Sequence, residues 1–213
     1  MRERRRICSN VSALAVDLLG TRLLTFRRAY LAMTPGQFRD GIFALFTVRF
    51  GNVAEIMVKR LGGLNKARSR FHDLFDDMNK KRVEVKFSRV LRKHDTKVTI
   101  NTVVSCIDEA RGERRALTVS EASREAFDSN IQQIKCSEFD ILYYGLFFRD
   151  KIVVFRADSA TVEEMPGYSN FQHKGNENEG QFHINEGALA YHMRNHKHLE
   201  LDYADLLNLL TAP

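Results

Sequence analysis

Two long apolar runs near the middle of the chain constrain its fold most strongly. They read FDILYYGLFF (139–148) and KIVVFRA (151–157), with Arg149 and Asp150 between them. Largely apolar runs of this length are typical of strands that are covered on both faces. We therefore predict a central β-hairpin that turns at Arg149-Asp150. A strand of this kind needs a sheet with a further layer of structure on each side.

Apolar residues at three- and four-residue spacing predict helices in much of the remaining chain. Pro35 suits the first turn of one helix, Asn52 and Ser120 suit the caps of two others, and Gly62-Gly63 suits a helix end. The segments concerned are VSALAVDLLGTRLL (11–24), PGQFRDGIFALFTVRF (35–50), NVAEIMVKRL (52–61), SEASREAFDSNIQQI (120–134), ALAYHMRNHKH (188–198) and YADLLNLL (203–210). The order of helices and strands predicts an α/β fold with a sheet flanked by helices.

Two further segments are of a different kind. KVTINTVVSCI (97–107) is rich in β-branched residues and predicts a strand. Residues 158–186 are polar and rich in Gly and Asn, which predicts a long loop. Long loops in compact proteins are commonly functional.

The composition limits the partners and the compartment. The 213 residues carry a formal net charge of +6, which favours a polyanionic partner. Cys8, Cys106 and Cys136 form neither a CxxC pair nor an even set, so they predict a reducing, cytoplasmic location. No apolar run approaches the roughly 20 residues needed to cross a bilayer, so we expect no membrane partner.

A set of charged residues lies on a second predicted hairpin. FHDLF (71–75) and RVEVKFSRV (82–90) read as strands on either side of a polar turn. The two-residue period of a strand places Glu84, Lys86 and Ser88 on one face, and Asp73 lies on the neighbouring strand. Two carboxylates from adjacent strands are a suitable pair of ligands for Mg²⁺, and the nearby ammonium of Lys86 can orient a water molecule.

The same set also fits a solvent-exposed hairpin face with a cross-strand ion pair, because acid-x-Lys is a frequent pattern. Three observations favour a site for phosphodiester hydrolysis. An acid stands about ten residues before Glu84 in a strand-like run of its own, Glu55 lies on the preceding helix, and basic residues occur on both sides. The histidines His192 and His196 have the spacing of zinc ligands, but a surface helix accounts for them better.

The stretch DLFDDMNKKRVEVK (73–86) resembles the PD-(D/E)XK nuclease superfamily. AEIMVKRL (54–61) resembles the first core helix of that superfamily, and NIQQIKCSEFDILYYGLFFRDKIVVF (130–155) resembles a later helix and strand pair of type II restriction endonucleases. QHKGNENEGQFHI (172–184) followed by ALAYHM (188–193) also resembles this group. The resemblance covers roughly residues 48–210. His72 replaces the proline of the family motif, which leaves Asp76 and Asp77 as rivals of Asp73.

The resemblance implies a central mixed β-sheet with helices on both faces, and Mg²⁺-dependent cleavage of double-stranded DNA by a homodimer. It implies that Asp73 and Glu84 bind metal, that Lys86 positions the nucleophile and that Glu55 supports the site. One nuclease domain would then comprise a helical segment (1–47), a catalytic core (48–157), a recognition loop (158–186) and C-terminal helices (187–213). A DNA repair or structure-specific nuclease of the same superfamily and a DNA-binding protein without catalysis are the alternatives.

The expected DNA contacts fall into two groups. Asn and Gln can pair with adenine, and Lys with guanine, which makes the polar loop the expected reader of sequence. Its candidates are Gln172, His173, Lys174, Asn176, Asn178, Gln181 and His183. Phosphate contacts are expected from the basic segments 59–70 and 80–97. These candidates are Lys66, Arg68, Arg70, Ser88 and Arg89. Gln132 or Gln133 is a further candidate for reaching the site or the DNA backbone, and a merely polar helix end fits these two glutamines equally well.

Overall fold

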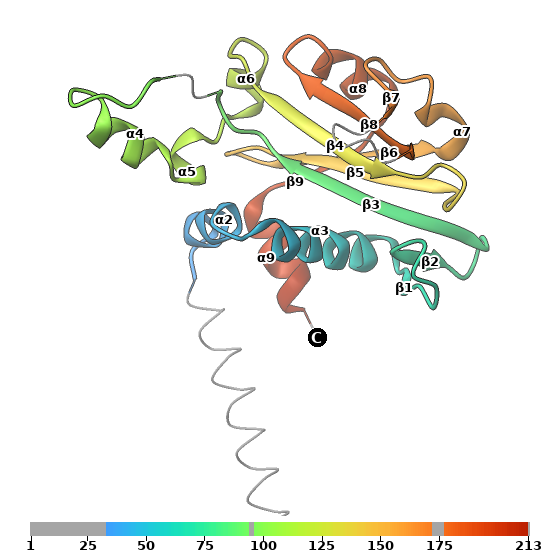
Figure 1. Ribbon diagram of the computed structural model, residues 1–213. Coiled ribbons are helices and arrows are strands. Elements are labelled where there is room, and N and C mark those ends of the chain that lie inside the picture. The colour runs from blue at the N-terminus through green and yellow to red at the C-terminus, as the bar shows by residue number, and fades with distance from the viewer. Residues whose placement is uncertain (1–32, 94–95, 172–176, 213) are drawn as a thin grey trace, which may run out of the picture. The chain divides into compact units, whose positions relative to one another are not determined.

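A mixed six-stranded sheet organises the structure. The computed structural model describes residues 33–93, 96–171 and 177–212, of which Pro35–Leu210 form one compact unit (Figure 1). The strand order is β1-β2-β3-β5-β6-β9, and every neighbouring pair is antiparallel except β3 and β5, which are parallel. The strands are β1 (Asn65–Lys66), β2 (Leu74–Asp76), β3 (Lys81–Arg89), β5 (Ile141–Phe147), β6 (Ile152–Asp158) and β9 (Lys197–Leu201). This confirms the predicted α/β class.

The apolar hairpin is the centre of this sheet, as predicted. β5 and β6 pair from Ile141–Asp158 to Phe147–Ile152, and β5 is also bonded to β3 along its whole length. Leu142, Tyr144, Leu146, Val153 and Phe155 are fully buried. The hairpin is therefore central both within the sheet and between the layers.

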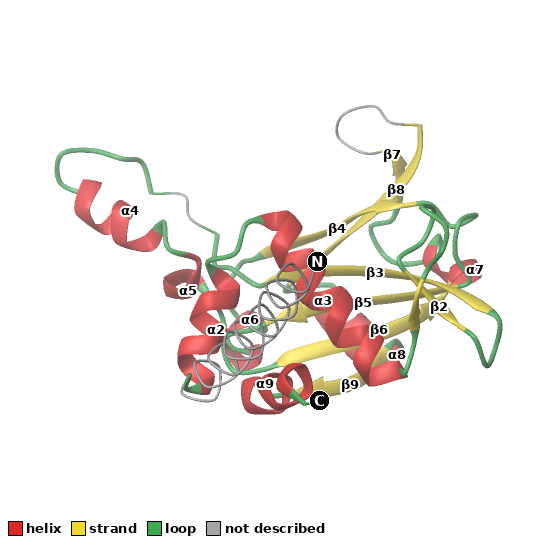
Figure 2. Cartoon of the chain, turned by 90° about the horizontal axis from the view of Figure 1, so that it is seen from below, coloured by secondary structure: helices red, strands yellow, loops and turns green. Residues whose placement is uncertain are grey.

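Helices cover one face of the sheet (Figure 2). They are α2 (Pro35–Phe43), α3 (Thr47–Gly62) and α9 (Tyr203–Thr211). Phe50 of α3 packs edge-to-face on Phe147 of β5 with ring centroids 5.0 Å apart, and Arg60 donates to the carbonyl of Leu209 in α9. Pro35 opens α2, and Gly63 ends α3 in the left-handed conformation, as predicted. Asn52 is not the cap of α3, because the packing of Phe50 extends that helix upstream to Thr47.

A second, three-stranded sheet covers the other face, where helices were expected. Its order is β4-β8-β7, all antiparallel, with β4 (Asp128–Ile134), β7 (Ser169–Phe171) and β8 (Glu177–Asn185). Short helices accompany it: α6 (Val119–Ala122), α7 (Ser159–Val162) and α8 (Leu189–Asn195). Phe182 and Ile131 of the small sheet join Tyr144 of the large sheet in one apolar core.

Three predicted segments are thus wrong. The helix expected over 120–134 is the short α6, capped by Thr118 instead of Ser120, followed by β4. The loop expected over 158–186 contains β7 and β8, because Phe182 and Ile184 alternate with polar residues and are buried. Residues 97–107 contain no strand; α4 (Val103–Glu109), followed by α5 (Gly112–Arg115), occupies this region.

The C-terminal prediction is confirmed, with α8 and α9 separated by β9. The helix predicted over 11–24 lies outside the described residues. Among the helices that the structure describes, none has both the length and the apolar character needed to cross a membrane.

The close approach of β5 to its neighbours yields a stability prediction. A Cβ atom on Gly145 would lie 2.3 Å from Cε1 of Phe87 and 2.4 Å from the carbonyl oxygen of Val153. The carbonyl belongs to the backbone of the paired strand and cannot move aside as a side chain could. Gly145→Ala should therefore lower the free energy of unfolding by about 1–3 kcal/mol. Gly41→Ala in α2, where the new Cβ meets nothing, should instead raise it by about 0.5–1 kcal/mol. Urea denaturation of both variants measures the contrast, and equal effects would contradict it.

Candidate active site

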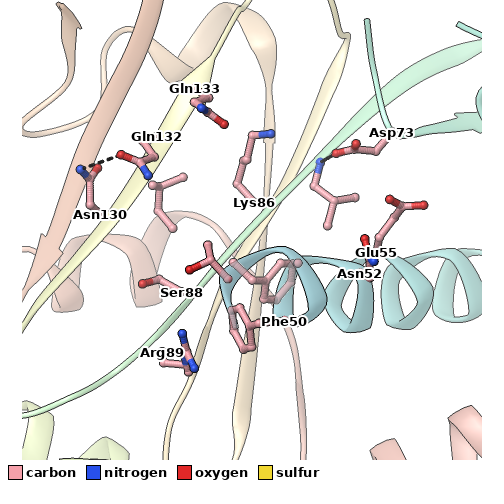
Figure 3. A pocket seen from close by; sticks show the side chains of 15 residues that line it. Phe50, Asn52, Glu55, Asp73, Lys86, Ser88, Arg89, Asn130, Gln132 and Gln133 are labelled. Carbon is pink, nitrogen blue, oxygen red and sulfur yellow. Dashed lines mark hydrogen bonds between the residues drawn. The ribbon is translucent and has the colours of Figure 1, made fainter. Parts of the chain in front are cut away.

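The edge of β3 is open over most of its length and forms the floor of a cleft. β2 pairs with β3 only from Lys81 to Val83, so from Val85 onward no described strand covers that edge. α3 and β4 form the two walls of this cleft, which has a volume of about 420 Å³ (Figure 3). Its lining residues are Thr47, Phe50, Gly51, Asn52, Glu55, Asp73, Val85, Lys86, Phe87, Ser88, Arg89, Asn130, Ile131, Gln132 and Gln133.

Asp73 is fixed on this open edge by the backbone of β3. It was expected within a strand over 71–75, but it comes directly before β2 (Leu74–Asp76). Its N–H donates to the carbonyl of Val83 (3.1 Å), and its Oδ2 accepts from the N–H of Val85 (3.0 Å). Its carboxylate therefore occupies the place that a further residue of β2 would take. Among the described residues, none bonds to the second oxygen, Oδ1, and Figure 3 shows the side chain beside the cleft.

Glu84 and Lys86 lie on the same face of β3, as the two-residue period predicts. Lys86 is opposite Tyr144 in the parallel register, so this face is the one turned toward the second sheet. Lys86 Nζ is 2.5 Å from Glu84 Oε1. Glu84 is only 8% exposed, and its Oε2 is buried without a hydrogen-bond partner.

The pKa of Glu84 is raised above its ordinary value. Burial is the largest cause, and the negative charges of Asp73 and Glu138 act in the same direction, while Lys86 opposes them. A buried carboxylate with one oxygen unsatisfied is an unfavourable arrangement unless a cation or a proton balances it.

The rival acids Asp76 and Asp77 have other partners. Asp76 Oδ1 accepts from the N–H groups of Met78 and Asn79, and its Oδ2 accepts from the Asn79 amide. These hydrogen bonds, that of the Asn79 side chain first, lower the pKa of Asp76. Asp77 accepts from Asn65 Nδ2 at 2.5 Å. Asp76 stabilises the hairpin turn, Asp77 bonds to β1, and neither lines the cleft.

Glu55 lies on the wall of the cleft that α3 forms. It is on α3, lines the cleft and pairs with Lys66 at 2.7 Å. Within the described ranges, no three His, Cys, Asp or Glu side chains come together as a metal-binding group. Glu55 thus borders the site, but it does not complete a three-carboxylate cluster with Asp73 and Glu84.

The residues expected to contact phosphate are in different situations. Arg68 and Arg70 are exposed, and the Arg70 guanidinium lies 5.5 Å from the centre of the Phe71 ring. Ser88 faces the cleft. Arg89 donates to the carbonyls of Phe43 and Leu45 and stacks over Phe50, so it holds the connection between α2 and α3 against β3.

Gln132 and Gln133 line the cleft from a strand, whereas a helix was expected. Gln133 has a positive φ of 60° and lies within a β-bulge between Gln132 and Ile134. Because a bulge interrupts the alternation of side chains, both glutamines are exposed. Figure 3 shows Gln133 above the Lys86 side chain. Asn52 and Asn130 also line the cleft and were not predicted there; the polar–apolar–polar order of Asn130, Ile131 and Gln132 was the available signal for Asn130.

Other predicted residues lie elsewhere. Gln181 and His183 are on β8, and Gln172, His173, Lys174 and Asn176 lie outside the described residues. His192 is not on a helix surface as expected: it is fully buried, and its Nδ1 is 2.9 Å from the Tyr144 hydroxyl. Burial lowers the pKa of His192 to about 4, so the ring is neutral at pH 7.

No model of a known protein family matches this chain, and no curated protein matches it either. The chemistry of the cleft therefore has to be judged from its own residues.

Asp73, which lines the cleft, and Glu84, which is buried beside the cleft residue Lys86, form a donor set that fits a hard divalent cation. Asp73 Oδ1 and the buried Glu84 Oε2 are carboxylate oxygens without protein partners among the described residues. Mg²⁺ in proteins is commonly held by one or two carboxylates together with water and substrate phosphate oxygens. Lys86 adds an ammonium group next to the same carboxylates.

The raised pKa of Glu84 predicts how stability depends on pH. The folded chain binds a proton at Glu84 that the unfolded chain releases near pH 4.5, so the stability from this group is present at low pH and is lost as the pH rises above about 4.5. Glu84→Gln removes this loss. The free energy of unfolding of Glu84→Gln relative to the unsubstituted protein should therefore increase as the pH rises from about 4.5, with the exposed Glu164→Gln as control. Urea denaturation over a pH series measures it, and a constant difference would refute the assignment.

Proposed function

We propose that the chain is a Mg²⁺-dependent endonuclease of the PD-(D/E)XK superfamily, a type II restriction enzyme that hydrolyses double-stranded DNA at a specific short sequence. One observation carries the proposal: Asp73 and Lys86 line a cleft whose floor is the open edge of β3, and the buried Glu84 pairs with Lys86 on the same strand. The β2–β3 hairpin, followed by β5 parallel to β3, supports a restriction-endonuclease-like core.

The residues of the cleft have separate tasks in this reaction. Asp73 Oδ1 and Glu84 Oε2 would hold Mg²⁺, which when bound supplies positive charge against the scissile phosphate and lowers the pKa of a coordinated water. With a cation on Glu84, the Lys86 ammonium would be held less tightly by that carboxylate and would orient the attacking water or offset charge on the phosphate. Glu55 and Lys66 border the site from the side of α3.

Arg68, Arg70 and Lys66 supply positive charge for the DNA backbone in this proposal. Arg68 and Arg70 are exposed, so their charges can reach phosphate without repacking of the core. Arg89 bonds to two backbone carbonyls, and we assign it to holding the cleft wall. The proposed substrate requires access to DNA, and the cytoplasmic location remains a prediction.

The first test is the cleavage of plasmid DNA. The protein should produce discrete fragments with Mg²⁺ and none with a chelator. Asp73→Asn, Glu84→Gln and Lys86→Ala should each lower the cleavage rate by at least about a hundredfold, because each removes one charge of the site. Gel analysis of a time course measures the rate.

Asp76→Asn is the matched control for this test. Asn keeps an acceptor for the turn hydrogen bonds of Met78 and Asn79, and position 76 does not line the cleft. Its cleavage rate should stay within about twofold of the unsubstituted protein. Loss of activity in Asp76→Asn with full activity in Asp73→Asn would exchange the roles of the two acids. Cutting restricted to branched or damaged DNA would instead favour a structure-specific repair nuclease.

Cleavage of both strands of a duplex also leads to a prediction about the oligomeric state of the protein. One chain presents one such cleft, and a two-fold symmetric homodimer would present one cleft to each strand. Sedimentation or light scattering should therefore give twice the 24.6 kDa mass of the chain at concentrations that support cutting. A monomer that cuts both strands at full rate would contradict the dimer.

One observation favours a second candidate, a DNA-binding protein without catalysis. Glu84 pairs with Lys86, and Glu55 pairs with Lys66, so these acids are already neutralised within the chain. In that case binding to DNA would occur with and without Mg²⁺, no fragments would form, and Lys86→Ala would leave DNA affinity unchanged.

A further inference from the structure

The small sheet has one buried face and one polar face. Ser129, Ile131, Phe182 and Ile184 are buried against the large sheet. The alternate residues point outward and meet in cross-strand pairs, Asn130 with His183 and Gln132 with Gln181. We call this set the amide face: Asp128, Asn130 and Gln132 of β4 with Gln181 and His183 of β8.

Hydrogen bonds between its own members order the amide face. Asn130 Nδ2 donates to Gln181 Oε1 (3.1 Å) and is 3.5 Å from Gln132 Oε1. Gln181 Nε2 donates to the carbonyl of Phe171 on β7, and His183 Nδ1 is 2.8 Å from Asp128 Oδ1. Side chains that are already ordered lose less conformational entropy when a ligand binds.

The amide face continues into the catalytic cleft. Asn130, Gln132 and Gln133 form the β4 wall, so this wall belongs both to the cleft and to the edge of the amide face. The bulge at Gln133 marks the junction, where one glutamine stays in the cross-strand pair and the next turns over Lys86 (Figure 3). A duplex with a phosphate at Asp73 and Lys86 would therefore have its neighbouring groove beside β4.

The chemistry of the amide face suits base edges better than phosphates. It has amides, an imidazole and a carboxylate, and none of the five residues is Lys or Arg. The major groove admits a two-stranded β-ribbon, and Asn or Gln can bond adenine at N6 and N7 simultaneously. Guanine is read mainly by Arg or Lys, which the amide face lacks.

We propose that the amide face reads sequence in the major groove, and that Gln132 and Gln181 recognise A·T base pairs. The inference rests on the proposed function only in taking duplex DNA as the ligand. It concerns recognition and not cleavage, so the two can be tested apart.

The experiment selects binding sites with the Lys86→Ala protein, in which β4 and β8 are unchanged, from a pool of random duplexes. The selected sites should share A·T pairs at fixed positions. Gln132→Ala and Gln181→Ala, each added to this protein, should weaken binding to the selected duplex by about tenfold to a hundredfold per lost bidentate contact. Binding to unselected duplex should change by less than about twofold, and the base preference at one position should relax.

Asn195→Ala is the control, because Asn195 is an exposed amide on α8 that bonds to the Tyr191 carbonyl of its own helix. It should leave both affinities unchanged, and thermal unfolding of all variants verifies that they fold. Sites made only of G·C pairs, an unchanged preference in both glutamine variants, or no binding to any duplex would overturn the inference. Selective binding that depends on the glutamines, combined with no Mg²⁺-dependent cutting by the unsubstituted protein, would overturn the proposed function alone.

Discussion

The open edge of β3 is the constraint on which the site depends. A strand edge without a partner exposes backbone donors and acceptors that another group must satisfy. Here the Asp73 carboxylate accepts a hydrogen bond from the N–H of Val85, and the N–H of Asp73 donates to the carbonyl of Val83. Because β2 stops short, the same edge leaves Lys86 and Ser88 accessible between α3 and β4. If β2 continued along β3, it would displace Asp73 from the Val85 N–H and cover the edge that forms the floor of the cleft.

The electrostatics of the site follow from its place beside the core. Glu84 and Lys86 are on the face of β3 that continues into the apolar cluster around Tyr144, where ionising a carboxylate is costly. Lys86 offsets part of that cost through one oxygen, and the second oxygen remains buried without a partner. A surface hairpin with the same sequence would hydrate Glu84 fully and would have little use for a cation. Burial is thus what separates this arrangement from an ordinary exposed acid-x-Lys pair.

The sequence predicted the parts of the fold in which local pattern and tertiary contacts agree. The apolar hairpin, the alternating strand of Glu84 and Lys86, and the helix of Glu55 all appeared as expected. The prediction failed over 120–134, where residues of good helix propensity mask a two-residue alternation of Ser129 and Ile131 with Asn130 and Gln132. Burial of Ile131 against the large sheet decided between these patterns. Asn52 failed as a cap for a similar reason, since Phe50 needs a helical position to reach Phe147.

The presence of β4 in place of the expected helix changes which side chains border the cleft. A helix would present one stripe of side chains to the cleft, while a strand divides its side chains between two faces. One face of β4 packs on the core through Ile131, which fixes the position of the other face relative to β3. Ser129 strengthens this link by donating to the carbonyl of Arg89 at 3.3 Å. The backbone strain at Gln133 is then understandable, because a left-handed residue costs about 1 kcal/mol or more and persists only where the surroundings hold it. At this bulge the surroundings are the core on one side and the cleft on the other, so the strained residue stands where the outer face of β4 borders the cleft.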